Sequence, residues 1–291
     1  MAVYEVKNKT VAIQVHSKGA ELKSLKRLDT GREYLWNADP AYWNRTSPVL
    51  FPFVGGVKNR EYRTKGRTYS MAQHGFVRDM EFSLLSQTED EIWFVLKDSE
   101  ETREMYPYEF VLKLGYCLLP DGVDVRWQVE NPGKEELPFS IGGHPAFYCP
   151  LDEGEKQTDY FIRFGKQEKV VSTGISEKGL ATDEKNTYNL DQGYLAITEN
   201  LFDRDALVIE HSQVMEVSLC RADKKPYVTV KMEEPLFGIW SPAKKNAPFI
   251  CIEPWCGRCD HENFSGELKE REWGNLVAPE GAWKAGYQII V

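Results

Sequence analysis

The sequence predicts an all-β protein built as a large antiparallel β-sandwich, and three observations favour this fold class. Apolar and polar residues alternate in many short runs, the spacing typical of strands with one buried face. These runs follow one another closely, with frequent Gly and Pro between them and with aromatic residues at 12% of the chain. Helical stretches are few and short, which is too little for a layer of helices packed on a sheet.

The clearest pair of expected strands is the hairpin formed by residues 110–117 and 123–130. Between them lies Pro120-Asp121-Gly122, a turn sequence because Pro fixes φ and Gly tolerates positive φ. Further strands are expected at residues 11–15, 91–96, 159–164, 205–210, 214–219, 228–232, 236–240, 249–253 and 283–290. Two short helices are expected at residues 99–106 and 266–273.

We expect the 291 residues to form a single domain, 1–291, because β folds of about 200–250 residues routinely form one domain. The sequence contains no low-complexity tether that would mark a linker. No apolar run approaches the roughly 18 residues of a membrane span, and the N-terminus lacks the pattern of a signal peptide. The sequence therefore predicts no contact with a membrane.

Net charge and cysteine content indicate which partners and which redox environment the protein is expected to have. The 36 basic and 45 acidic residues give a net charge of −9, the wrong sign for binding a phosphate backbone, so nucleic acid is not an expected partner. Six cysteines are too sparse for a disulfide framework, and Cys117, Cys220 and Cys251 lie in apolar runs. These features favour a reducing, cytoplasmic environment.

Two histidines and one glutamate have sequence surroundings that suggest a catalytic site. His74 lies in MAQHGFVRD (71–79) and His144 in SIGGHPAFYCP (140–150), each beside a glycine, which lets the backbone turn sharply or approach a ligand closely. Glu253 ends the apolar run 249–252 and precedes a Pro-Trp pair. Because burial disfavours the charged form of a carboxyl group, such a glutamate could have a raised pKa and act as a general base near neutral pH.

A possible metal site is the cluster Cys256, Cys259 and His261, which contains a C-x-x-C pair and a nearby histidine. A structural zinc site needs a fourth ligand, and no second C-x-x-C or His-x-His pair is present. The sequence also lacks the phosphate-binding loop, the dinucleotide fingerprint, the GxSxG elbow and the HExxH zinc motif. We therefore expect neither a metal nor a cofactor.

Five segments, taken in order, resemble the aldose 1-epimerase (galactose mutarotase) family, most closely its LacX-like branch. They are SPVLFPFVGGVKN (47–59), QHGFVRD (73–79), GGHPAF (142–147), FDRDAL (202–207) and IEPWCGRCD (252–260). The likeness extends from GAELKSL (19–25) to the C-terminal strand. It implies a large antiparallel β-sandwich, the same fold class that the residue pattern predicts independently.

The resemblance also implies roles for individual residues. His144 matches the general acid of the family, Glu253 its general base and His74 a second histidine of the sugar pocket. The substrate-binding residues that it suggests, with two aromatic candidates chosen by adjacency, are Arg60, either Asp205 or Asp203, Trp255 and Phe147. Residues 203 and 205 would share a face if this segment were an alternating strand, so the choice between the two aspartates stays open.

The implied reaction is the interconversion of the α and β anomers of a hexose. An acid and a base on opposite sides of the sugar ring open it, and the ring recloses after rotation about the C1–C2 bond. One alternative is a hexose-6-phosphate 1-epimerase, for which Arg32, Arg45, Arg78 and Lys58 could supply phosphate ligands. Another is a non-catalytic carbohydrate-binding protein. The expected partner is a small-molecule sugar, and the chain is expected to be a monomer or a homodimer.

Overall fold

The computed structural model describes residues 1–233 and 236–291, which form two large antiparallel sheets and smaller additions. One large sheet has nine strands in the order β17 (Tyr194–Ala196), β14 (Phe161–Arg163), β19 (Glu216–Cys220), β20 (Pro226–Met232), β24 (Ala282–Ile290), β10 (Gly122–Glu130), β9 (Val111–Leu119), β8 (Glu91–Lys97) and β7 (Ser83–Gln87). The predicted antiparallel sandwich is confirmed.

The second large sheet has eight strands, and one of them organises the site described below. Its order is β16 (Ala181–Asn189), β15 (Lys169–Ile175), β18 (Leu207–Ile209), β21 (Leu236–Trp240), β22 (Phe249–Cys256), β12 (Ile141–Gly143) and β4 (Val49–Leu50), with β13 (Ala146–Tyr148) also pairing with β22. Because β21 lies on one side of β22 and both β12 and β13 lie on the other, β22 is a central strand. All eight of its residues are buried.

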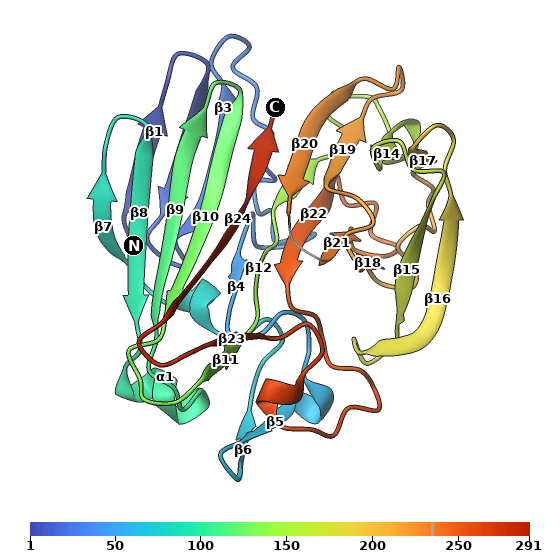
Figure 1. Cartoon of the computed structure of the whole chain (residues 1–291). Coiled ribbons are helices and arrows are strands. Elements are labelled where there is room, and N and C mark those ends of the chain that lie inside the picture. Colours follow the sequence, from blue (N-terminus) through green and yellow to red (C-terminus); the bar gives the residue numbers. More distant parts are fainter. Residues whose placement is uncertain (234–235) are drawn as a thin grey trace.

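The C-terminal strand β24 joins the N-terminal and C-terminal halves of the nine-stranded sheet. It pairs with β10 on one side and with β20 on the other. Figure 1 shows β24 between the strands of the first half of the chain and those of the second half. Since the two halves of this sheet meet only along β24 within the described residues, its ladder hydrogen bonds hold them together.

Smaller elements complete the fold. They are the sheet β1 (Val3–Lys7), β2 (Val11–His16) and β3 (Glu21–Arg27), the pairs β5 (Glu61–Thr64) with β6 (Arg67–Ser70) and β11 (Leu137–Phe139) with β23 (Asn275–Val277), the helix α1 (Glu100–Met105), and the 3₁₀ turns η1 (Lys58–Arg60), η2 (Val77–Asp79), η3 (Gln157–Asp159) and η4 (Leu268–Glu270). Ser99 caps α1 by accepting a hydrogen bond from the backbone N–H of Thr102.

The expected hairpin and most expected strands are confirmed, whereas one expected helix and two expected strands differ. The β9–β10 pairing runs from Leu119 opposite Gly122 to Val111 opposite Glu130, as the turn sequence predicts. Residues 266–273 do not form a helix but contain only the turn η4. An isolated segment of two turns is a marginal helix, and here the backbone becomes extended at Arg271, whose guanidinium is held by Asp260.

The other two differences are strands that are shorter than expected. The strand expected at 159–164 is only β14, because Asp159 belongs to the turn η3. The strand expected at 205–210 begins only at Leu207, because Asp205 has a positive φ of 77°, which lies outside the β region.

The main hydrophobic core includes residues from both large sheets, among them Trp127 of β10, Ile252 of β22 and Phe51. Each is nearly inaccessible to solvent. On β22 the alternation of a strand sends Ile250 and Ile252 into this core, while Cys251 and Trp255 belong to two separate hydrophobic clusters. The strand is thus buried on both faces, and its second face is available to form a site.

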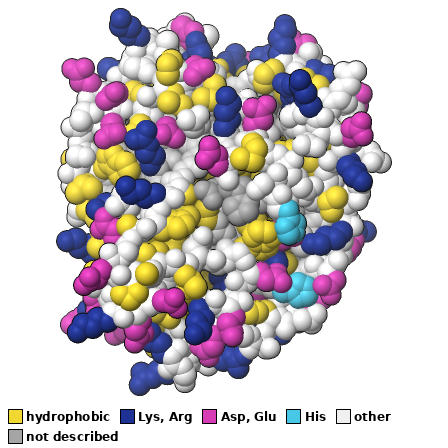
Figure 2. Space-filling model, in the orientation of Figure 1, with side chains coloured by type: hydrophobic (Ala, Val, Ile, Leu, Met, Phe, Trp, Pro, Cys, Tyr) yellow, Lys and Arg dark blue, Asp and Glu magenta, His cyan; other side chains and the backbone are white. Residues whose placement is uncertain are grey.

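Among the described residues, no helix is long and apolar enough to cross a membrane. On the face shown in Figure 2, acidic and basic side chains are interspersed, and hydrophobic side chains gather toward the centre. No continuous basic stripe crosses this face, in keeping with the net charge of −9.

Candidate active site

A cavity of about 350 Å³ opens over the face of β22 that points away from the main core. Its volume falls within the range of small-molecule sites in proteins, about 300–1,000 Å³. The lining residues are Trp43, Gly55, Gln73, His74, Arg78, His144, Ile175, Gly179, Asp205, Ala206, Val208, Trp240, Glu253, Trp255 and Cys259. They come from segments far apart in the sequence, so the cavity exists only in the folded chain.

Strand register places His144 opposite Glu253. In β12, Gly142 pairs with Trp255, and in β13, Ala146 pairs with Cys251. Both pairs keep the same register, so position 144, between the two short strands, falls opposite position 253. The backbone N–H of His144 points away from β22 and donates to the carbonyl of Pro48 at 3.0 Å, while the N–H of Ile252 donates to the carbonyl of Pro145 at 3.2 Å. His144 and Glu253 therefore face each other as a non-hydrogen-bonded pair, in which side chains on one face lie close together.

The imidazole and the carboxyl group are in direct contact. His144 Nε2 lies 3.1 Å from Glu253 Oε2, and the two residues are 7% and 2% exposed. Trp43 lies at a ring-centroid distance of 4.8 Å and an angle of 32° from the His144 ring, and Trp240 lies edge-on to it at 5.7 Å. Packing by two indoles fixes the orientation of the imidazole toward Glu253.

His74 is held by reciprocal hydrogen bonds with Gly55. The backbone N–H of His74 donates to the Gly55 carbonyl at 2.9 Å, and the Gly55 N–H donates to His74 Nδ1 at 3.1 Å. Because Nδ1 accepts a hydrogen bond, the neutral ring carries its proton on Nε2. The rings of His74 and His144 are 5.6 Å apart, edge to face.

The turn that carries His74 requires the glycine that follows it. His74 has φ 70° and Gly75 has φ 71°. A Cβ atom at Gly75 would lie 2.1 Å from the carbonyl oxygen of Phe51, so only glycine fits this close approach between two backbones. A non-glycine residue with positive φ is strained, and such strain is common at functional sites.

Of the two candidate aspartates, the structure brings Asp205 to the cavity. Asp205 lines the cavity, and its Oδ1 accepts a hydrogen bond from the backbone N–H of Ala206 at 2.7 Å. Asp203 is exposed and lines a separate surface hollow beside Arg204. The expectation that both residues share a face fails because this segment is a turn, in which side chains do not alternate as they do in a strand.

Two further predicted contact residues lie away from the cavity. Arg60 is exposed in η1 and is not among the lining residues, and the Phe147 ring is 0% exposed in the main core, where it cannot touch a ligand. The predicted Trp255 does line the cavity. Sequence reasoning missed Trp43, Trp240 and Gln73 as lining residues. Gln73 lies in the QHGFVRD motif, whereas the two tryptophans had no sequence signal beyond their residue type.

Arg78 is the cation of the cavity wall. The sequence suggests Arg78 only as a phosphate ligand, together with Arg32, Arg45 and Lys58, and of these four residues it alone lines the cavity. Its Nη2 donates to the Gln73 carbonyl at 2.8 Å, and its buried Nε has no hydrogen-bond partner among the described residues. Arg45 lies behind it and pairs with Asp79 at 3.0 Å. A guanidinium with an unused donor can bind an oxygen of a ligand.

Burial and nearby charges shift the pKa values of the three central groups. Burial, with smaller effects from Arg78 and Arg45, lowers the pKa of His144 to about 3. Burial and the neighbouring His144 and Arg78 hold the pKa of His74 well below its usual value. Burial, followed by the charge of Asp205, raises the pKa of Glu253 well above its usual value. Both imidazoles are therefore neutral near pH 7, and Glu253 keeps its proton to a higher pH than an exposed glutamate does.

His144 and Glu253 are thus two titratable groups in direct contact whose pKa values burial shifts in opposite directions. Their 3.1 Å contact is short enough for proton transfer between the two groups. Such a pair can remove a proton from one oxygen of a ligand and deliver a proton to another oxygen nearby. The arrangement can therefore perform acid–base chemistry on a small molecule rich in hydroxyl groups.

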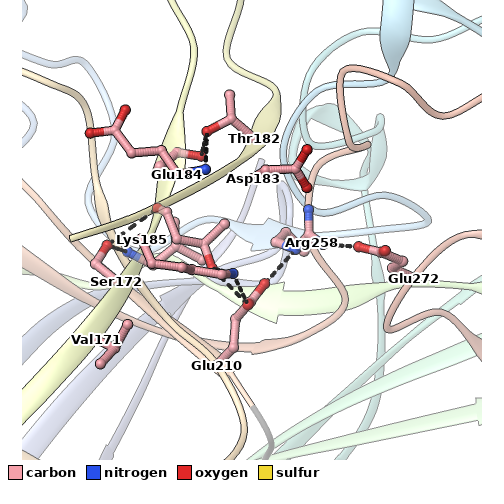
Figure 3. A network of polar contacts seen from close by, with 12 residues as sticks. Val171, Ser172, Thr182, Asp183, Glu184, Lys185, Glu210, Arg258 and Glu272 are labelled. Carbon is pink, nitrogen blue, oxygen red and sulfur yellow. Dashed lines mark hydrogen bonds and ion pairs between the residues drawn. The ribbon is translucent and has the colours of Figure 1, made fainter. Parts of the chain in front are cut away.

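A polar network centred on the buried Glu210 and Arg258 lies between strands of the second large sheet (Figure 3). Glu210, at the end of β18, pairs with Arg258 at 2.7 Å and with Lys185 of β16 at 3.1 Å, and it accepts a hydrogen bond from Thr173 of β15 at 2.6 Å. Arg258 also contacts Glu272. This network ties the segment after β22 to the strands that carry Ile175 and Val208 into the cavity wall.

The C-x-x-C cluster does not gather metal ligands in the part of the chain that the structure describes. Cys259 lines the cavity, Cys256 belongs to the main core, and His261 Nε2 lies 3.3 Å from Asp183. Within residues 1–233 and 236–291, the one group of three ligand-type residues with clustered ligand atoms is His144, Cys251 and Glu253.

A large antiparallel β-sandwich with a buried imidazole–carboxyl pair in an open cavity has the features of an acid–base enzyme. The chain belongs to the aldose 1-epimerase family, a class of isomerases, because the model of that family matches residues 2–289. It is 34% identical over 296 residues to the chromosomal LacX protein of Lactococcus lactis subsp. lactis. That alignment covers 99% of this chain and 98% of the LacX protein.

Solved structures agree with this membership. A galactose mutarotase related enzyme from Lactobacillus acidophilus superposes with a TM-score of 0.93 at 33% identity, covering 99% of this chain and 97% of that one. A galactose mutarotase-like protein from Lactobacillus casei gives a TM-score of 0.91 at 26% identity, covering 99% of both chains. The resemblance to this family is therefore confirmed over the whole chain.

We expect Arg258→Met to lower the free energy of unfolding by about 3–5 kcal/mol, because it removes the partner of a buried carboxylate. The matched control is Arg204→Met, which removes an exposed arginine 3.0 Å from Glu184 and should cost less than about 1 kcal/mol. Urea unfolding of both variants and the parent checks the difference. Equal losses in the two variants would contradict a structural role for the network.

We expect His74→Gln to weaken the pH dependence of stability on the acid side. The folded pKa of His74 is depressed, so below about pH 6.5 the unfolded chain binds more protons and the parent loses stability as pH falls. Between pH 7.5 and pH 5.0 this group accounts for up to about 2 kcal/mol of that loss. Glutamine can still accept the hydrogen bond from Gly55, which keeps the local structure.

The measurement is urea unfolding of the parent, His74→Gln and His211→Gln at the two pH values. His211 is exposed and serves as the matched control, which should follow the parent. A parent and a His74→Gln variant that lose the same free energy between pH 7.5 and pH 5.0 would show that His74 is not held neutral by the fold.

Proposed function

We propose that this protein is an aldose 1-epimerase that interconverts the α and β anomers of a hexose. The observation that carries the proposal is the contact of His144 and Glu253 at 3.1 Å inside a cavity of about 350 Å³. The ring oxygen O5 and the hydroxyl oxygen O1 of a pyranose are both bonded to C1. An acid and a base that lie side by side, rather than on opposite sides of the ring, can therefore reach both oxygens.

Ring opening requires a proton to leave O1 and another to reach O5. We assign Glu253 as the base for O1 and His144 as the acid for O5, starting from the form in which the shared proton is on His144. As Glu253 accepts the O1 proton and His144 protonates O5, the C1–O5 bond breaks and C1 becomes an aldehyde. The charged pair becomes a neutral pair in this step, which burial favours.

Ring closure reverses these transfers on the other face of the aldehyde. After rotation about C1–C2, the O5 hydroxyl returns its proton to His144 as O5 attacks C1, and Glu253 protonates O1. Both residues regain their starting protonation states, and no atom is gained or lost. Each positioned proton transfer contributes about 10²–10⁴-fold to the rate, which is substantial for a reaction that already proceeds in water.

The remaining lining residues orient the sugar in this proposal. His74 Nε2–H and the unused donor of Arg78 can bind ring oxygens or hydroxyl groups, and the Asp205 carboxylate can accept from hydroxyl groups. Trp43, Trp240 and Trp255 offer apolar surface for the C–H face of the ring. We further propose that the protein acts on its sugar in the cytoplasm, as a monomer or a homodimer.

A hexose phosphate is the second candidate substrate, and the pair Arg78 and Arg45 favours it. Both arginines lie close enough to the histidines to lower the histidine pKa values. Among the described residues, the two arginines share a single ion-pair partner, Asp79, at 3.0 Å from Arg45 and 3.9 Å from Arg78. A phosphate group bound to Arg78 would supply the missing negative charge. The carboxylate of Asp205, which also lines the cavity, would repel a phosphate bound beside it.

We expect Glu253→Gln to lower kcat by about 10²–10⁴-fold, because the amide keeps the shape of the side chain but cannot accept the O1 proton. Polarimetry of freshly dissolved α-D-glucose and α-D-galactose measures turnover, and calorimetry should find sugar affinity within about tenfold of the parent. The control is Glu104→Gln, which changes an exposed glutamate of α1. Unchanged turnover in Glu253→Gln would exclude Glu253 as the base.

If the substrate is a sugar phosphate, we expect Arg78→Met to raise KM for that sugar phosphate. This fold-increase should be at least about ten times the fold-increase in KM for the free sugar. The reason is that a guanidinium–phosphate contact is lost only with the phosphorylated ligand. Initial rates with glucose and glucose 6-phosphate, for parent and variant, give both KM values. Equal changes for the two sugars would assign Arg78 to a hydroxyl group and leave the free hexose as substrate.

A further inference from the structure

Cys251 lies next to the proposed acid–base pair and is not used by the reaction. It shares the cavity-side face of β22 with Glu253, because residues two apart on a strand point the same way. One ligand atom each from His144, Cys251 and Glu253 lie within 4.8 Å of one another, and all three residues are buried. A thiol, an imidazole and a carboxyl group form one of the ligand sets that bind zinc in proteins.

The spacing of these atoms is close to that of a zinc site with an open position. Zinc bonds of about 2.0–2.1 Å to nitrogen and oxygen, at tetrahedral angles, separate two such ligands by about 3.3 Å. His144 Nε2 and Glu253 Oε2 are already 3.1 Å apart. A bond of about 2.3 Å to sulfur would place the thiolate about 3.6 Å from each of them. Since the ligand atoms already lie within 4.8 Å of one another, the sulfur has to move closer by at most about 1.2 Å.

Charge balance and access also suit a divalent cation. A thiolate and a carboxylate neutralise a 2+ ion, and a neutral imidazole adds no charge, so the complex is compatible with burial. His144 and Glu253 line the open cavity, which gives the ion a path to the site. Glu253 Oε2 is buried, and its contact with His144 Nε2 would be replaced by a bond from each of the two atoms to the ion.

The surroundings favour reversible binding rather than a resident metal. A histidine that holds a metal permanently usually donates its other ring N–H to a partner, which strengthens the site by about 10–100-fold. His144 Nδ1 is buried and has no such partner within residues 1–233 and 236–291. The ion would also occupy the two groups that the sugar needs, so metal and sugar exclude each other.

We propose that His144, Cys251 and Glu253 form a binding site for a thiophilic divalent cation such as Zn²⁺, which inhibits the enzyme by competing with the sugar. Binding releases the Cys251 proton, and any proton on Glu253, to solvent, and no redox change occurs. The inhibition rests on the proposed function of the pair, whereas the binding of the cation does not.

Metal binding to the full-length protein is measured first, without reference to activity. Titration with ZnCl₂ in a non-chelating buffer, followed by calorimetry, is expected to show one saturable, EDTA-reversible site that a Cys251→Ser substitution removes. Titration with CoCl₂ is expected to give the near-ultraviolet thiolate-to-cobalt absorption band, which requires a cysteine ligand. Absence of this band in the parent at saturating Co²⁺ would overturn the proposal.

Variants then identify the cysteine. Cys251→Ser and Cys251→Ala are each expected to weaken the affinity for Zn²⁺ by at least tenfold and to abolish the cobalt band. Cys220→Ser is the matched control, because Cys220 is also buried in a strand but lies in the other large sheet. Circular dichroism confirms folding of each variant. Parent-like affinity for Zn²⁺ in a folded Cys251 variant would refute the site.

The activity measurement separates this inference from the proposed function. With the parent, Zn²⁺ is expected to raise the apparent KM for the sugar while leaving kcat unchanged. For Cys251→Ala, the ratio of zinc-treated to zinc-free rates is expected to stay near one at the concentration that halves the parent rate. Zinc binding at Cys251 by a parent that accelerates no sugar would refute the proposed function alone. A parent that converts the sugar rapidly and whose rate Zn²⁺ does not change would refute the inference alone.

Discussion

The site depends on one constraint, the register with which β12 and β13 pair along the same edge of β22. That register sets His144 opposite Glu253 although the two residues are more than a hundred positions apart. A shift of one residue would turn Glu253 into the main core and bring Ile252 to the cavity, because side chains alternate between the faces of a strand. Since Ile250 and Ile252 fill the core on the other face, packing of the core also maintains the register that brings His144 beside Glu253.

Burial shifts the pKa values of His144 and Glu253 in opposite directions, and it also costs free energy because both groups lose contact with water. A carboxyl group and an imidazole in water would be charged and neutral respectively near pH 7, and they would have no reason to share a proton. In the cavity, burial raises the pKa of Glu253 and lowers that of His144, so a single proton can move between them. The strained φ values of 70° at His74 and 77° at Asp205 belong to the same site.

Much of the fold could be predicted from the sequence because it depends on local patterns. Alternation and turn residues identified the β9–β10 hairpin, and the motifs GGHPAF and IEPW singled out His144 and Glu253. The cavity wall could not be predicted in the same way. Trp43 reaches His144 from a loop, and Trp240 reaches it from the end of β21. Asp205, unlike Asp203, lines the cavity because of the turn it lies in, and no sequence pattern predicts the φ of that turn. Phe147 follows the catalytic motif, yet strand alternation sends its ring into the core.

The same closeness that lets His144 and Glu253 act together also makes the site attractive to metal ions. Two ligand atoms 3.1 Å apart, with a thiol close by, satisfy much of the geometry of a zinc site before any ion arrives. An acid–base enzyme of this design must therefore limit the affinity of its own site for metals. His144 Nδ1 has no hydrogen-bond partner among the described residues, which makes the imidazole a poorer metal ligand and lowers the affinity of the site for metals. Its Nε2 remains available to the sugar in the proposed reaction. The same missing hydrogen bond also fits the low pKa of His144, because nothing at Nδ1 stabilises the protonated ring beyond its immediate backbone.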